Sequence, residues 1–286
     1  MSDQLAPGLP ADWLNGWLAA LGVTVLLPEV ELSWTADPVP LAVFRYPEGI
    51  PLAERIANAL PDGAELQQRC LAALPRKVTL PAYKAAAARS RGARDGSLAM
   101  SLTDLVSGRT FDQENLPHGA FDPPAPRGIT LVERAVTCRQ LLEHDSAKKL
   151  ADTLDGVAVR AKANGLGFDI RRVPSGVQPS ADVMVDPAVE CLCFSALVLF
   201  PIRGDGRRAC QRGWDRTSTQ RGVFTWPAWS KPLGVWGIDA LLDHFYAGAT
   251  GRTQELLGIV GSYASVPYQS TGSSDVTRGY GSLRIT

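Results

Sequence analysis

The chain has 286 residues and a mass of 30.6 kDa, enough for one large domain or two ordinary ones whose core needs no disulfide or metal. Its 29 lysines and arginines equal its 29 acids, so the composition excludes a polycationic tail and is typical of a globular protein. The longest apolar run, residues 191–200, is about half of the roughly 20 residues that cross a bilayer, so we expect no transmembrane segment.

The N-terminus carries acids and prolines where a secretory signal would carry basic residues and an apolar run. The five cysteines have irregular spacing, which indicates reduced thiols and not a disulfide framework. We therefore expect a cytoplasmic protein that does not associate with a membrane.

The N-terminal part of the chain predicts a helix, three strands and a helical pair. Asp12 is placed to cap a short amphipathic helix, and Gly22 to end it. Short β-rich runs then predict a small antiparallel meander at residues 23–27, 30–34 and 39–46. A three-to-four spacing of apolar residues predicts helices at residues 51–60 and 64–74.

The middle of the chain changes character twice. Residues 76–94 are basic, with no acid before Asp95, and predict a solvated stretch. The proline-rich residues 107–128 cannot form a regular helix or a central strand, so we expect a long loop or linker there.

The C-terminal part predicts a second set of helices and strands. Helices are expected at residues 129–142, 146–163, 187–200 and 232–246, with Asp186 capping the third and Gly248 closing the fourth. Strands are expected at residues 168–173 and 182–185, a long twisted hairpin at 201–232, and short strands or a weakly ordered tail in the last 25 residues.

Together these elements predict an α+β protein of short antiparallel strands and several amphipathic helices, in two subdomains. We expect an N-terminal subdomain at residues 1–95, a proline-rich loop or linker at 96–130, and a C-terminal subdomain at 131–286.

Three short motifs resemble catalytic, cofactor-binding or metal-binding signatures, but the accompanying residues that each signature requires are missing. Residues 204–209 (GDGRRA) fit a dinucleotide fingerprint without the acid about 20 residues on, so they predict a hairpin turn. Residues 146–149 (SAKK) fit S-x-x-K without its partner motifs, and Ser146 or Asp145 is better placed as a helix cap. Cys191 and Cys193 point about 200° apart on a helix, so we expect core thiols, no metal site and no cofactor.

The most informative segment is residues 203–231, in which seven basic residues outnumber two acids and alternate with aromatic rings. Guanidinium groups bind phosphates and aromatic faces stack on bases, so this mixture is typical of a nucleic-acid interface. It is equally typical of a protein–protein groove, where tryptophan and arginine are enriched. The candidate nucleic-acid contacts are Arg203, Arg207, Arg208, Arg212, Arg216 and Arg221, with Trp214 or Trp226 as a stacking platform. Because Trp226 and Trp229 are three apart on a strand, we expect at most one of them in the same core.

Three segments carry a resemblance to a known family: GFDIRR (167–172), VDPAVECLCFSALVLFPIRGDG (185–206) and FTWPAWSKPLGVWGIDALLD (224–243). They resemble the C-terminal half of a CRISPR-associated family of type I-G systems, formerly called I-U. There an apolar x-P-x-x-E-x-L-x-x-x-x-L helix precedes an arginine hairpin and a W-P-x-W or Y-x-x-W segment. The N-terminal residues 13–34 resemble the opening of the same proteins, whereas residues 75–165 resemble no part of them.

This resemblance implies a large-subunit-like component of an interference complex, which binds guide RNA and target DNA without doing chemistry. We therefore expect a non-catalytic subunit that contacts nucleic-acid backbone and other CRISPR-associated subunits. The alternatives are a small-molecule enzyme whose site is assembled by the fold, and a structural adaptor that contacts only protein.

Overall fold

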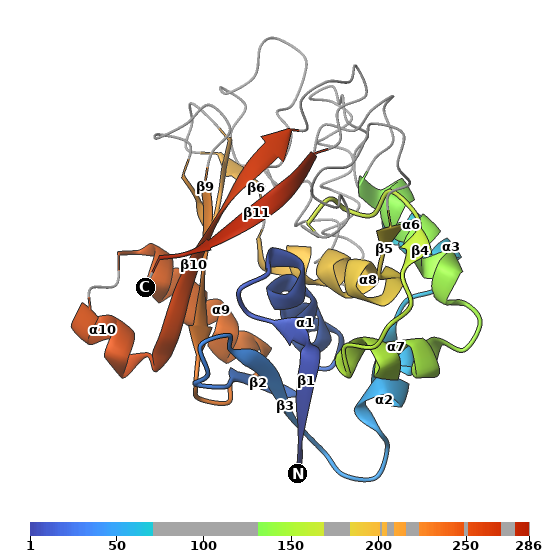
Figure 1. The fold of residues 1–286 in the computed structure, drawn as a ribbon, viewed down its shortest axis with the longest axis horizontal. Helices are drawn as coiled ribbons and strands as arrows, with labels where there is room; N and C mark the ends of the chain where they lie inside the picture. Colours follow the sequence, from blue (N-terminus) through green and yellow to red (C-terminus); the bar gives the residue numbers. More distant parts are fainter. Residues whose placement is uncertain are drawn as a thin grey trace.

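The computed structural model describes residues 1–70, 131–168, 184–200, 202–204, 209–215, 223–248, 251–269 and 278–285. Helices and small antiparallel sheets alternate along these residues, which confirms the predicted α+β class. Helix α1 lies in the middle, with the C-terminal strands on one side and the green and yellow helices on the other (Figure 1). No helix in these ranges is both long enough and apolar enough to cross a membrane.

The N-terminal sheet has the order β1-β3-β2, formed by Ser2–Pro10, Leu41–Tyr46 and Glu31–Trp34. Two of the three predicted strands are confirmed. Residues 23–26 were expected in a third strand but belong to helix α1 (Leu14–Leu26), and β1 takes the third place. The valine-rich run resembles a strand because this helix is buried nearly all round and lacks an alternating polar face.

The two ends of α1 also differ from the prediction. Trp13, not Asp12, is the N-cap residue, and no side chain caps the helix. Gly22 lies inside the helix, where a β-carbon would stand 1.9 Å from the carbonyl oxygen of Leu192. This glycine therefore allows a close helix crossing and does not end the helix.

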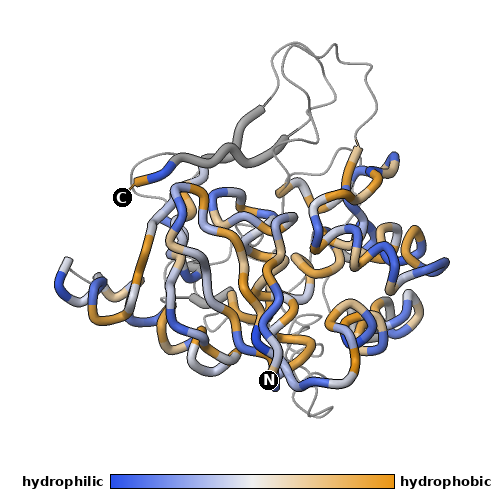
Figure 2. The backbone as a smooth tube through the Cα atoms, turned by 60° about the horizontal axis from the view of Figure 1, so that its bottom comes forward, coloured by the Kyte–Doolittle hydropathy of each residue, from blue (hydrophilic) through white to orange (hydrophobic). Residues whose placement is uncertain are grey.

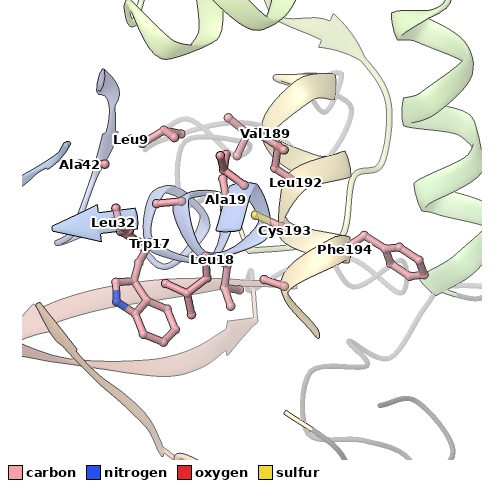
Figure 3. Close-up of a cluster of buried hydrophobic side chains, with 14 of the residues drawn as sticks. Leu9, Trp17, Leu18, Ala19, Leu32, Ala42, Val189, Leu192, Cys193 and Phe194 are labelled. Carbon is pink, nitrogen blue, oxygen red and sulfur yellow. The ribbon is translucent and has the colours of Figure 1, made fainter. Parts of the chain in front are cut away.

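The partner in that crossing is α8 (Pro187–Ala196), whose start is confirmed as predicted. The Asp186 carboxylate accepts hydrogen bonds from the backbone N–H groups of Ala188 and Val189, and Pro187 takes the first helical position. Ala19 of α1 lies beside Leu192 and Cys193 of α8 at the interface (Figure 3). A single 3₁₀ turn, Leu197–Leu199, follows α8.

The C-terminal sheet has the order β11-β10-β9-β8, formed by Arg278–Arg284, Ile259–Gln269, Val223–Trp229 and Trp214–Asp215. The predicted long hairpin is divided between two sheets, because β6 (Ile202–Gly204) pairs only with β7 (Ala209–Gln211). Gly213, with φ +82°, makes the turn that separates them.

The other helices lie around the core: α2 (Leu52–Ala59), α3 (Gly63–Cys70), α6 (Leu131–Leu142), α7 (Ser146–Leu154), α9 (Val235–Tyr246) and α10 (Gly251–Leu256). Helix α7 ends at Leu154, earlier than predicted, because Gly156 adopts φ +78° and turns the chain toward the short pair β4 (Ala161–Lys162) and β5 (Met184–Val185). Gly248 follows α9 with φ +94°, as predicted. Of the strand expected at residues 168–173, only Phe168 is described, and it is not in a strand; the rest of it and the linker at 96–130 lie outside the described ranges.

Three tryptophan N–H groups join the N-terminal and C-terminal parts of the chain. They donate from Trp17 to the Pro227 carbonyl (2.8 Å), from Trp226 to the Ala11 carbonyl (2.7 Å) and from Trp229 to the Leu32 carbonyl (3.0 Å). Hydrophobic segments from both parts meet in one buried cluster, and the hydrophobic colours of the tube gather toward the middle (Figure 2). Both proposed subdomains thus contribute to a common core, and their division stays a prediction.

We expect Gly22→Ala to lower the free energy of unfolding by roughly 1–3 kcal/mol, because the added methyl group overpacks the α1–α8 crossing. Helix propensity alone would favour alanine, so the steric effect opposes the intrinsic one. Gly251→Ala is the matched control, because no atom lies within 4 Å of its added β-carbon. Urea denaturation of both variants measures the difference, and equal midpoints would contradict the close crossing.

Candidate functional site

Some of the predicted nucleic-acid residues belong to described strands, and others fall in the connections between those strands. Arg203 belongs to β6, although its side chain lies outside what the structure describes. The connection between β6 and β7 carries Arg207 and Arg208, and the connection between β8 and β9 carries Arg216 and Arg221. These four positions lie outside the described ranges. The strand ends are described: Gly204 opposes Ala209, which confirms the predicted turn, and Asp215 opposes Val223.

Both terminal nitrogens of the Arg212 guanidinium donate hydrogen bonds to other groups of the protein. Its Nη2 lies 2.7 Å from Asp239 Oδ1, and its Nη1 lies 2.7 Å from Asp243 Oδ1. The same guanidinium donates to the carbonyl oxygens of Leu199 and Asp239, and lies 5.6 Å from the centre of the Phe200 ring. With its side chain only 14% exposed, Arg212 joins the β7–β8 turn to α9. These bonds disfavour the phosphate contact expected at Arg212, which stays a prediction.

Trp226 lies in the core and is not a stacking platform. It is fully buried, and its ring stacks at 5.8 Å between centroids on Phe224 and on Tyr263. A base could reach this ring only if the core opened, so the prediction for Trp226 is corrected. Trp214 is half-buried, with its ring centroid 5.4 Å from that of Phe224.

Trp229 is also fully buried. The expectation that at most one of Trp226 and Trp229 lies in the same core is therefore wrong, because both belong to one buried cluster. The two indoles have different neighbours. Trp226 packs with Trp17 of α1, whereas Trp229 meets Trp34 of β2 edge to face, at 6.2 Å and 87°. The N-terminal sheet and α1 together cover this end of β9.

Sequence inspection missed a buried polar cluster where α6, α7 and α8 meet the loop at residues 163–168. Glu190 of α8 is fully buried, and its Oε2 accepts from the backbone N–H of Leu166 at 2.5 Å. Arg134 of α6 is 5% exposed and donates to the carbonyl oxygen of Gly165 at 3.2 Å. Gly165 has φ +57°, and a β-carbon there would lie 2.9 Å from Glu190 Cδ. Two buried ionisable side chains, Glu190 and Arg134, thus hold one tight turn.

Asp186 forms the second half of this cluster. Besides capping α8, its carboxylate accepts a hydrogen bond from the Thr153 hydroxyl of α7, at 2.9 Å to Oδ2. Burial raises the pKa of Asp186, although the Thr153 hydroxyl and the two helix N–H groups oppose that shift. The signal available in the sequence was an acid within an apolar run, namely Glu190 among residues 185–200.

The cysteines near this cluster are buried core thiols, as expected from the sequence. Burial raises the pKa of Cys138 and of Cys191, which favours the neutral thiol over the thiolate. The Cys193 thiol donates to the carbonyl oxygen of Asn15 at 3.1 Å, which adds a polar contact to the α1–α8 interface. The described residues contain no group of three or more potential metal ligands.

The S-x-x-K motif also has a structural role in this fold. The Ser146 hydroxyl donates to the carbonyl oxygen of Leu142 at 2.5 Å, and the Lys149 ammonium to that of Leu141 at 2.7 Å. Asp145 occupies the cap position of α7 with φ +58° but forms no side-chain cap bond. Both motif side chains therefore bind the end of α6 and do not face each other as nucleophile and base.

Neither a family model, nor a curated protein, nor a solved structure matches this chain. Its function is therefore inferred from its residues and their geometry.

We expect Asp186→Ala to lower the free energy of unfolding by roughly 1–3 kcal/mol, because it removes a helix cap and the acceptor for a buried hydroxyl. Asp186→Asn retains a side-chain oxygen for these donors and is expected to lose less.

The comparison of wild type with Asp186→Asn should also depend on pH. A raised pKa means that the folded protein binds this proton more tightly than the unfolded chain does, so ionisation lowers stability as pH rises from 3.8 through the raised value. Lowering the pH through that window should therefore stabilise wild type relative to the variant. Denaturant titrations at several pH values measure this, and a constant difference would contradict it.

We expect Arg212→Ala to lower the free energy of unfolding by roughly 1–3 kcal/mol, because two backbone carbonyl groups lose their donor and Phe200 loses packing. The ion pairs contribute little, since the Asp239 and Asp243 side chains are 43% and 68% exposed to screening solvent. Asp243→Asn is the matched control and should change stability by well under about 1 kcal/mol. An equal loss in the control would instead assign the effect to the ion pair.

Proposed function

We propose that this chain is a non-catalytic subunit of a CRISPR-type ribonucleoprotein effector complex, and that it contacts the phosphate backbone of guide RNA or target DNA. The observation that carries the proposal is the division within residues 203–231. One part of this segment is anchored in the core, Arg203 belongs to β6, and four other arginines fall in the β6–β7 and β8–β9 hairpin connections. Those arginines are Arg207, Arg208, Arg216 and Arg221.

The anchored part supplies a rigid base for the two connections. Arg212 binds α9 and the 3₁₀ turn, while Phe224 and Trp226 pack against Trp17 of α1. A base held in this way limits the conformational entropy lost when side chains on the adjoining connections bind a ligand. The aromatic residues thus support an interface without forming its surface.

The chemistry of the connections favours backbone over base recognition. Guanidinium groups pair with phosphates irrespective of sequence, and in guide-dependent complexes base pairing supplies the specificity. With Trp226 in the core, the aromatic stacking that we expected at this position is removed from the proposal. The proposed contact therefore rests on the arginines, with Trp214 as the remaining aromatic candidate.

Two of the segments that resemble the CRISPR-associated family, residues 185–206 and 224–243, are neighbours where the structure describes them. Residues 185–206 contain α8 and β6, and residues 224–243 contain most of β9 and the first part of α9. Helix α8 packs against α1, and β9 bonds to α1 through the Trp17 indole. These segments support the proposal because they build the base from which both arginine connections extend.

The small-molecule enzyme gains no support from the described residues, in which the Glu190 cluster is enclosed within the core. The protein-only adaptor is favoured by one observation, the exposed indole of Trp236 on α9.

We expect the purified chain to bind single-stranded RNA or DNA with an affinity that falls steeply with salt, because each phosphate contact releases counterions. Arg207→Glu/Arg208→Glu should weaken binding to all sequences alike and should flatten the salt dependence. Lys148→Glu/Lys149→Glu is the matched control, because it reverses an adjacent basic pair on α7. Fluorescence anisotropy across a salt series measures the slopes. The same affinity and slope in the arginine variant and the wild type would refute the proposed contact.

A further inference from the structure

Helix α9 carries a tryptophan on its solvent side. Its inner face packs through Val235, Ile238, Leu241 and Leu242, which are all buried. Trp236 is 82% exposed and is the one aromatic residue among the exposed large apolar side chains of the described residues. Packing in the core does not explain a tryptophan at this position, because most of the Trp236 side chain remains in contact with water.

Two carboxylates share the face of α9 on which Trp236 lies. Asp239 and Asp243 follow Trp236 at spacings of three and seven residues, and exposed Ala240 follows at four, so these residues form one stripe. We name Trp236, Asp239, Ala240 and Asp243 the α9 stripe.

Arg212 fixes the position of both acids. Its guanidinium bonds to each carboxylate at 2.7 Å and is itself largely shielded, with 14% of the side chain exposed. The two aspartates remain 43% and 68% exposed, so each still presents part of its carboxylate to solvent. One arginine balances only one of the two negative charges. The α9 stripe is therefore an oriented acidic surface beside a flat aromatic ring.

The negative charge of the α9 stripe favours a protein partner that carries arginine over a nucleic acid. A nucleic-acid strand would bring its phosphates close to the aspartates, and that repulsion opposes base stacking on Trp236. An arginine side chain can lie flat on an indole and pair with a carboxylate at the same time. Exposed tryptophan is also the residue type most typical of energetic hot spots in protein interfaces.

We propose that the α9 stripe is a docking site for an arginine-bearing surface of a partner protein, with Trp236 and Asp239 binding one guanidinium and Asp243, one turn further along the helix, pairing with a second. Asp239 and Asp243 provide the charge complementarity, and the bond network of Arg212 orders them before the partner binds. This inference does not depend on the proposed nucleic-acid contact, because it uses none of the arginines in the hairpin connections.

Isothermal titration calorimetry with defined probes tests this docking site. The probes are a synthetic peptide that alternates arginine with alanine, the same peptide with citrulline in place of arginine, and a single-stranded oligothymidylate. We expect wild type to bind the arginine peptide and not its uncharged citrulline counterpart. Trp236→Ala should weaken that binding by about tenfold, a loss typical of an interface tryptophan.

Three further variants make the result specific. Asp243→Asn should weaken binding of the arginine peptide, and Ala240→Arg should abolish it by placing a like charge in the stripe. Leu256→Ala, which removes another exposed apolar side chain at 70% exposure, should leave binding unchanged. Thermal melts should show each variant folded, since all four positions face solvent.

The opposite results would overturn the docking site. They are no binding of the arginine peptide to wild type, equal binding of the citrulline peptide, or equal binding of the arginine peptide to wild type and Trp236→Ala. Loss of oligothymidylate binding in Trp236→Ala alone would assign the indole to nucleic acid instead. A failure of the hairpin arginines to bind nucleic acid would leave the peptide results unchanged, so the two proposals fail separately.

Discussion

The close crossing of α1 and α8 positions most of the structure around it. Gly22 brings the two backbones together where a methyl group would overlap the carbonyl oxygen of Leu192, and the Cys193 thiol bonds across the same interface. Because α1 is buried on nearly every side, the N-terminal sheet, the C-terminal sheet and α8 all pack on one helix. The tryptophan N–H bonds then fix β9 relative to α1 and to the N-terminal sheet.

Much of the local structure could be predicted from the sequence, because the signals involved are local. Asp186 and Pro187 mark the start of α8, and Gly248 follows the end of α9, since caps depend on only a few neighbouring residues. The errors share a different cause. Gly22 was expected to end a helix, and residues 23–26 to form a strand, because the partner that buries them lies far along the chain. No local pattern reports such a partner.

The candidate site shows the same limit. Residues 203–231 contain arginines and aromatic rings at similar spacing. Composition alone does not distinguish a side chain that packs in the core from one that can bind a ligand. Arg212 and Trp226 become anchors because acids on α9 and rings on α1 lie beside them in the fold. The role of Glu190 could not be predicted from the sequence, because the turn at Gly165 and Leu166 that it contacts is brought near only by the tertiary structure. The spacing of the α9 stripe was visible in the sequence, but its exposure was not.

The burial of α1 also has a consequence for the order in which the chain can fold. Its main helical partner begins about 160 residues downstream, and the carbonyl oxygen that accepts from the Trp17 indole belongs to Pro227. During synthesis, α1 therefore leaves the ribosome well before α8 and β9 can cover its apolar surface. Contacts of such long sequence separation form late and leave apolar segments exposed to aggregation in the meantime. The apolar surface of α1 is thus exposed for a long part of synthesis, when a chaperone could protect it from aggregation.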